Sequence, residues 1–268
     1  MPFLTEDGRP LDELVLAQRP ADGHLFHMRA PFAYLDPVTG RRYPVAARPP
    51  HRPDTDLAER EPDAVGVTDL ASVPMWLWSF IASYGRQSAP AVLHDERSIV
   101  AARLGDREAA LAQRRMDDRV FRTALREQRA PLLRSWLMWA WVSADRERQF
   151  GGVAGVLLLG QAIIGALAVL AASVAAFWQP WWLLVLPVVV VAGLAWRALA
   201  PLVLVLMGSI AVLGPLLVLH LAALVPLRLI EAVVELLAGG DPRDVLRPTV
   251  APPGEGSEAS PEGPPLGR

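Results

Sequence analysis

The sequence contains no cysteine and no lysine. The absence of cysteine excludes disulfide bonds, thiolate nucleophiles and cysteine-ligated metal clusters, and it leaves the redox compartment open. The absence of lysine makes every fixed cation an arginine, a bias that we attribute to a GC-rich genome because alanine, proline and valine are also abundant. The formal net charge of −2 indicates no basic stripe, so we expect no nucleic-acid partner.

Charge is also missing from two long stretches of the C-terminal half. No Asp, Glu or Arg occurs in residues 149–196 or in residues 198–227. About 18 consecutive apolar residues already suffice for a transmembrane helix. We therefore predict an integral membrane protein whose residues 151–227 form three α-helical spans, at about 153–177, 181–200 and 202–227.

Arginine and tryptophan orient these spans. Arg134, Arg146 and Arg148 precede the first span and the first loop has no arginine, so the N-terminal domain is expected in the cytoplasm, under a bacterial plasma membrane. Seven of the nine tryptophans lie between residues 136 and 196, where a belt at the lipid–water interface is expected. Three spans would place the C-terminus outside, whereas a re-entrant third segment broken at Pro215 would keep every arginine inside.

Residues 1–148 have the composition of a water-soluble domain. They contain 21 Arg and 21 Asp plus Glu, and the first residues lack the apolar stretch of a signal peptide. Apolar residues on both sides of Asp36-Pro37-Val38-Thr39-Gly40 predict a β-hairpin over residues 24–46. The charged, proline-rich stretch 46–64 is expected to be a surface loop or insertion.

Capping and helix-start signals predict about four helices after the hairpin. They start near Ser72, Pro90, Asp106 and Pro131, and the last three end near Leu104, Gln128 and Ser143. The predicted fold class is therefore α+β, a short sheet followed by helices, joined to the membrane segment. Beyond the spans, residues 227–238 predict an amphipathic helix in the lipid interface. Residues 239–268 are rich in proline and are expected to be disordered.

The third predicted helix of the domain carries two charges on its apolar face. Steps of three and four from Leu111 place Arg114 and Asp118 on one face with Phe121 and Leu125. A buried charge is tolerated only when it is paired and hydrogen-bonded. Two interpretations follow: an Arg114–Asp118 ion pair within the helix, or an Asp118 that points into a polar pocket shared with other helices.

Asp69, His94 and Asp95 are further candidates for chemistry. His94 and Asp95 lie in the second predicted helix, and Asp69 precedes the first. With Asp118 they could ligate a divalent metal through oxygen and imidazole, or perform acid–base catalysis. A helix cap or a core hydrogen bond is the structural alternative for the His-Asp pair.

Gln161 and His220 are the polar exceptions inside the predicted spans. An intramembrane histidine is a functional candidate by default. The structural alternative is a neutral imidazole hydrogen-bonded to a backbone carbonyl that Pro215 or Pro226 leaves without a donor.

Several segments, taken in chain order, resemble one known family. The segments are Val67-Thr68-Asp69-Leu70-Ala71-Ser72-Val73-Pro74, Trp76, Tyr84-Gly85-Arg86, Ala89-Pro90-Ala91-Val92-Leu93-His94-Asp95, Arg114, Asp118, Phe121, Ala124, Leu125 and Trp136-Leu137-Met138. In order and spacing they resemble the domain-of-unknown-function 1353 family of phages and bacteria, over about residues 24–148. The resemblance implies a small α+β domain. It also implies one polar cluster, in which we include Asp69, His94, Asp95, Arg114 and Asp118 with Thr68 and Ser72.

Three functions remain open on these observations. The first is a membrane-anchored interaction or accessory module, with a structural polar cluster and a protein partner at the membrane. The second is a membrane-tethered, metal-dependent hydrolase that uses Asp69, His94, Asp95 and Asp118. Histidine–aspartate phosphohydrolases pair His-Asp with other ligands, but they need more histidines than this chain offers. The third is a small transporter or channel subunit.

Overall fold

The computed structural model describes residues 2–18, 25–48, 65–70 and 84–246, and its N-terminal part contains two small sheets. The first sheet has the strand order β1-β4-β5, and the second has the order β2-β3-β6. All neighbouring strands are antiparallel. The strands are β1 (Phe3–Thr5), β2 (Leu16–Gln18), β3 (Phe26–Met28), β4 (Phe32–Leu35), β5 (Arg42–Val45) and β6 (Val67–Thr68).

The hairpin predicted around Asp36–Gly40 is present, but it is shorter than predicted. β4 pairs with β5, from Phe32 opposite Val45 to Leu35 opposite Arg42. The Asp36 carboxylate accepts hydrogen bonds from the Val38 backbone N–H and the Thr39 hydroxyl, and Gly40 supplies the positive φ of +70° that the turn needs. The segment before β4 belongs elsewhere, because β3 pairs with β2 and β6 in the other sheet.

Three helices follow the strands. They are α1 (Ser88–Ala102), α2 (Arg107–Glu127) and α3 (Leu132–Phe150). The predicted cap of α2 is confirmed, since the Asp106 side chain accepts a hydrogen bond of 2.8 Å from the Ala109 N–H. The helix predicted to start at Ser72 lies outside the described residues.

The N-terminal core forms where both sheets pack on α1 and α2. Aromatic and aliphatic strand residues meet one apolar face of each of these helices. The cluster contains Phe3, Met28, Phe32, Tyr34, Tyr43, Val45, Leu70, Val92, Leu93, Val120 and Ala124. Arg119 of α2 adds an ion pair of 2.8 Å to Asp36, which ties the hairpin turn to the helix.

α3 is seven residues longer than predicted. The residues that follow Ser143, Ala144-Asp145-Arg146-Glu147-Arg148, are mostly charged. In the structure, Arg146 and Glu147 are buried and pair with each other and with α2. The helix therefore continues through charges that a sequence pattern assigns to solvent.

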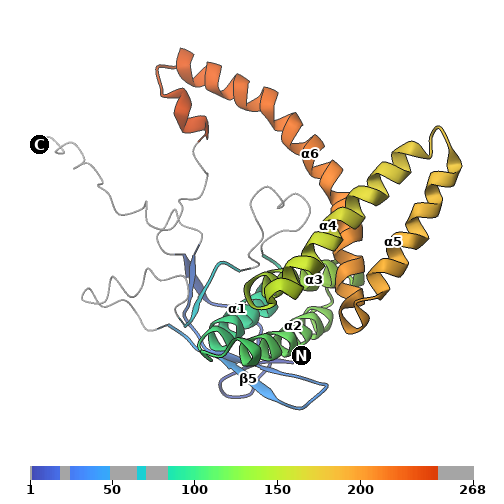
Figure 1. The fold of residues 1–268 in the computed structure, drawn as a ribbon. Helices are drawn as coiled ribbons and strands as arrows, with labels where there is room; N and C mark the ends of the chain where they lie inside the picture. Colours follow the sequence, from blue (N-terminus) through green and yellow to red (C-terminus); the bar gives the residue numbers. More distant parts are fainter. Residues whose placement is uncertain (1, 19–24, 49–64, 71–83, 247–268) are drawn as a thin grey trace, which may run out of the picture.

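Two helices of the C-terminal half are long and apolar enough to cross a membrane. α4 (Gly152–Ala175) has 24 residues, about 36 Å at 1.5 Å per residue. α6 (Ala200–Leu237) has 38 residues, with Pro215 and Pro226 inside it. Figure 1 shows α4 and α5 as a hairpin and α6 running back beside α4 before it diverges.

The predicted spans are thus found in part. The second, at 181–200, is broken into the 3-10 turn η4 (Pro180–Leu184), α5 (Val185–Leu194) and the 3-10 turn η5 (Arg197–Leu199), where Arg197 adopts a φ of +51°. The third span and the amphipathic helix of residues 227–238 form one continuous helix. The tail predicted from residue 239 first makes the 3-10 turn η6 (Pro242–Leu246), because Asp241 caps it through the Arg243 N–H. Residues 247–268 lie outside the described part.

α3 connects the N-terminal core to the long apolar helices. Small residues of α3 pack against α4 and the N-terminal part of α6. This second core contains Ala140, Ala144, Leu158, Ala162, Leu202, Val203 and Leu206. The other face of α3 meets α2 through Met138, which packs with Phe121 and Leu125. One helix therefore contacts both parts of the protein.

A sharp corner of glycines joins α3 to α4. Gly152 has a φ of +59°. A Cβ added at Gly151 or Gly155 would lie well inside van der Waals contact with the Glu147 carbonyl oxygen. Only glycine fits at these positions, because α4 begins by folding back against the last turn of α3.

We predict that Gly155→Ala destabilises the full-length protein by about 1–3 kcal/mol or more, because a methyl group must displace backbone atoms at the corner. Thermal unfolding in detergent measures this. Gly160→Ala, in the same helix with no atom within 4 Å of the added methyl, is the control and should leave the melting temperature unchanged or higher. Equal effects of the two substitutions would contradict a close-packed corner.

Candidate functional site

The predicted polar cluster centres on Asp118 of α2, whose carboxylate is 0% exposed. One oxygen, Oδ1, lies 3.1 Å from His94 Nε2 on α1. The other, Oδ2, accepts hydrogen bonds from Ser143 Oγ at 3.0 Å and from Arg146 Nη1, both on α3. A single carboxylate therefore joins three helices.

The α3 side of this cluster is a buried chain of charges. Arg146 donates through Nε and Nη2 to Glu147 Oε1, at 3.1 and 2.8 Å. Arg115 of α2 reaches the same Glu147 oxygen at 3.4 Å. We call His94, Asp118, Ser143, Arg146 and Glu147 the Asp118 network.

Electrostatics favours a charged carboxylate at Asp118. Burial opposes its ionisation, but the hydrogen bond from His94 and the charges of His94, Arg146 and Arg114 outweigh burial and lower the Asp118 pKa below 3.8. Burial likewise opposes charge on His94, yet its hydrogen bond to Asp118 and the nearby Asp95 carboxylate prevail, so the His94 pKa is raised above 6.5. The two groups stabilise each other as an ion pair.

Asp95 and Thr68 form the outer part of the cluster. Thr68 Oγ1 donates to Asp95 Oδ2, and Asp95 Oδ1 lies 3.9 Å from His94 Nδ1. Burial, together with the charge of Asp69, raises the pKa of Asp95 from 3.8 to about 6 against opposing contributions from His94 and Thr68. The structure thus brings Thr68, Asp69, His94, Asp95 and Asp118 together.

The intrahelical Arg114–Asp118 pair is not formed. Both residues are buried on α2 as predicted, but the Nε and Nη1 atoms of Arg114 have no hydrogen-bond partner. The Asp118 oxygens are occupied instead by donors from α1 and α3. Of the two interpretations, the structure supports an Asp118 shared between helices. Ser72, the remaining predicted member of the cluster, lies outside the described residues.

Sequence reasoning missed the α3 half of the network. Ser143, Arg146 and Glu147 continue the three-and-four spacing from Trp139, so the helical period alone could have placed them on the buried face. It also missed the buried ion pair between Arg97 of α1 and Asp117 of α2, at 3.1 Å.

The geometry offers little room for a metal ion at Asp118. Both carboxylate oxygens already accept hydrogen bonds, and Arg146 brings a fixed positive charge. Within the described ranges, no group of three or more His, Asp and Glu side chains is placed to hold a metal. The arrangement can hold helices together, and it raises the pKa of one carboxyl, that of Asp95, to about 6.

Of the two intramembrane candidates, Gln161 is explained by a structural contact. Its Oε1 accepts a hydrogen bond of 2.7 Å from the indole N–H of Trp196, which joins α4 to the turn between α5 and η5. His220 lies in α6. Neither residue belongs to the Asp118 network.

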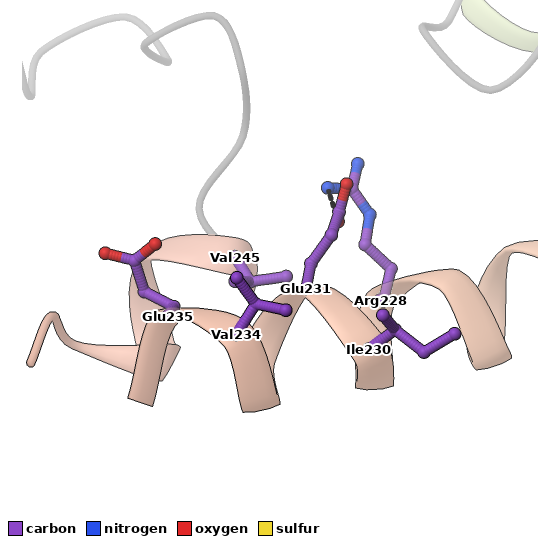
Figure 2. A pocket seen from close by; sticks show the side chains of 6 residues that line it. All are labelled: Arg228, Ile230, Glu231, Val234, Glu235 and Val245. Atoms are coloured by element: carbon purple, nitrogen blue, oxygen red, sulfur yellow. Dashed lines mark hydrogen bonds and ion pairs between the residues drawn. The ribbon is translucent and has the colours of Figure 1, made fainter. Parts of the chain in front are cut away.

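An open groove of about 460 Å³ lies at the far end of α6, where η6 folds back on the helix (Figure 2). Its lining is mixed apolar and charged, and Arg228 pairs with Glu231 at 2.9 Å. It contains none of the predicted site residues. Its composition matches the amphipathic character predicted for residues 227–238.

Residues 63–142 match the model of the family described as "Protein of unknown function (DUF1353)". The predicted resemblance is confirmed for this segment. The DUF1353 segment contains Thr68, His94, Asp95 and Asp118, but it ends one residue before Ser143. The α3 partners of Asp118 therefore lie beyond the matched residues. No curated protein and no solved structure matched the chain.

We predict that Asp118→Ala destabilises the full-length protein by roughly 3–5 kcal/mol, because it removes the counterion of the buried His94 and one of the two carboxylate partners of the buried Arg146. Denaturant unfolding in detergent measures the change. The control, Asp145→Ala, removes an exposed acid that pairs with Arg148 and should cost less than about 1 kcal/mol. A loss below about 1 kcal/mol for Asp118→Ala would mean that the network does not support the fold.

The pKa shifts predict that stability falls as the pH rises from about 4 to above 6.5. The folded pKa of His94 lies above 6.5, so its contribution is complete below that value and is lost as the pH rises through the folded pKa. Asp95, raised from 3.8 to about 6, also favours the folded state at lower pH and loses this contribution as the pH rises through about 6. The Asp118 contribution is lost only as the pH falls below 3.8.

The unfolding midpoint in urea, measured across this range, tests the prediction. The combined variant His94→Gln, Asp95→Asn should flatten the profile. A wild-type midpoint that is constant, or that rises with pH, would be incompatible with these shifts.

Proposed function

We propose that this chain is a membrane-anchored interaction or accessory module, in which the Asp118 network fixes the DUF1353 segment against the membrane helices. One observation carries the proposal: Asp118 joins α1, α2 and α3, and α3 also packs on α4 and α6. A catalytic carboxylate needs free access to a substrate, whereas Asp118 is saturated and buried. Its role is therefore structural.

Exposure of the apolar helices supports a membrane location. Only 28% of the most apolar window of α4 and 33% of that of α6 is buried within the protein. A core helix of a soluble protein would be mostly buried, and large apolar surfaces left exposed in water would drive aggregation. The exposed Phe177, Trp178 and Trp181 around the α4–α5 loop suit an aromatic belt. Lipid is the occupant that fits these surfaces.

The topology that we propose has three crossings, out through α4, back through η4 and α5, and out through α6. The return segment Pro180–Leu194 is short, about 22 Å if fully helical against about 30 Å of hydrocarbon. Arg197 can reach the cytoplasmic interface by snorkelling. The unbroken α6 favours a full crossing rather than a re-entrant segment. This crossing would leave the C-terminus outside and the DUF1353 segment in the bacterial cytoplasm.

Because the chain lacks cysteine, single-cysteine labelling tests this topology without background. We predict that Gln179→Cys and Asp241→Cys react with an impermeant maleimide on intact cells. Glu108→Cys, exposed on α2, should react only after permeabilisation. Labelling of position 241 only after permeabilisation would establish the re-entrant alternative, and equal labelling of 108 and 179 would contradict the anchor.

A hydrolase is the second candidate, and Asp95 is the observation that favours it. Its pKa of about 6, beside Asp69 and His94, is what an acid–base catalyst needs near neutral pH. Metal content decides between the two functions. We predict substoichiometric divalent metal in the purified full-length protein, unchanged in His94→Ala. Stoichiometric metal that is lost in this variant would make the hydrolase the better account.

A further inference from the structure

Arg114 is a buried cation with two unsatisfied donors. The residue is 3% exposed, and its Nε and Nη1 atoms have no hydrogen-bond partner. A guanidinium cannot lose its proton at any pH at which proteins fold, so it cannot escape the penalty of burial by becoming neutral. Unsatisfied donors on a buried cation are costly, and they point to an anion that completes the site.

The neighbouring arginines have carboxylate partners, whereas Arg114 has none among the described residues. Arg97 pairs with Asp117, Arg115 pairs with Glu147, and Arg146 pairs with both Asp118 and Glu147, each within 3.4 Å. Arg115 lies exposed at the edge of this region, and Arg114 is buried.

Asp117 supplies the complementary unsatisfied atom. Its Oδ1 accepts from Arg97 and Gln113, but its buried Oδ2 accepts from no group. Arg114 and Asp117 are three residues apart on α2, a spacing at which helix side chains are neighbours. A ligand that satisfies both must carry anionic oxygens for Arg114 and a hydroxyl hydrogen for Asp117. A protonated phosphate has both.

The position of this pair is close to the predicted lipid interface. At the start of α2, Arg107 donates to the Phe150 carbonyl at 2.9 Å, beside the first turn of α4. Arg114 follows seven residues later, about 10 Å along the helix. A phosphate on a lipid headgroup or a free phosphate can therefore supply the same chemistry.

We propose that Arg114 and Asp117 bind a phosphate group that carries a P–OH, that is, inorganic phosphate or a phosphate monoester. Arg114 donates to the anionic oxygens, and Asp117 Oδ2 accepts the hydrogen of the hydroxyl. A phosphodiester has no such hydroxyl, so the site selects monoesters over diesters. Sulfate, which is unprotonated at neutral pH, is likewise a poor ligand.

The test uses full-length protein in phosphatidylcholine nanodiscs and the melting temperature as readout, since a ligand of the folded state raises it. Inorganic phosphate is titrated at constant ionic strength, with sulfate as the comparison. In parallel, nanodiscs are made with phosphatidic acid, a monoester, or with phosphatidylglycerol, a diester. We expect a higher melting temperature with phosphate, with phosphatidic acid or with both. Stabilisation by phosphate identifies a free ligand, and stabilisation by phosphatidic acid identifies a lipid headgroup.

Arg114→Met removes the charge and keeps the side-chain length. It should weaken phosphate affinity at least about tenfold, and it should melt no lower than wild type without ligand, because it removes an unpaired buried charge. Arg115→Gln, the exposed neighbour, should retain binding. Asp117→Asn should let sulfate and the diester bind as well as phosphate.

The proposal is overturned if phosphate and phosphatidic acid stabilise wild type no more than Arg114→Met, or if sulfate equals phosphate in the wild type. It is also overturned if Arg114→Met melts lower without ligand, because Arg114 is then satisfied within the protein, for example by rotation toward Asp117.

Discussion

The carboxylate of Asp118 receives donors from three directions, and no other described group joins as many elements of the domain. His94 approaches it from α1, and Ser143 and Arg146 approach it from α3. A buried ionised carboxylate without such partners would be strongly destabilising, so the helices must keep the positions that provide them. Strands pack on α1 and α2, and the apolar helices pack on α3. The relative placement of the two halves thus depends on this one group.

The network and the glycine corner act at the same point of the chain. Glu147 accepts from Arg146 and Arg115 through its side chain, while its backbone carbonyl lies against Gly151 and Gly155 at the start of α4. Any displacement of the last turn of α3 therefore disturbs both the ion pairs and the entry into α4. This is a physical reason for the arrangement to be rigid, and it suits a module that presents one surface at the membrane.

Much of the local structure could be predicted from the sequence. The Asp36–Gly40 turn, the Asp106 cap and the apolar stretches depend on residues close together in the chain, and each was found. The clustering of His94, Asp95 and Asp118 followed from family motifs. The α3 half of the network was missed, because Arg146 and Glu147 lie in a charged run that resembles a solvated helix end. The helical period from Trp139 does place them on the buried face, but the partners that make their burial possible lie about 30 residues away, and local patterns do not contain them.

The errors in the membrane segment have a similar origin. Hydropathy shows that residues 181–200 are apolar but not that the helix breaks at Arg197, whose backbone is left-handed. Pro215 suggested a break in the third segment, yet α6 continues through it, since a helix tolerates a proline when neighbouring groups satisfy the freed carbonyl. Length and composition predict which segments are apolar, whereas packing decides where each helix ends.

A double-mutant cycle between Asp118 and Arg146 tests the central claim most directly. The account predicts that Asp118→Leu and Arg146→Met each destabilise the full-length protein strongly, because each breaks the buried ion pair that joins α2 to α3. It also predicts that the double variant loses less stability than the sum of the two single losses, because both substitutions break the same pair. Additive losses, or single losses below about 0.5 kcal/mol, would show that Asp118 does not hold the helices together.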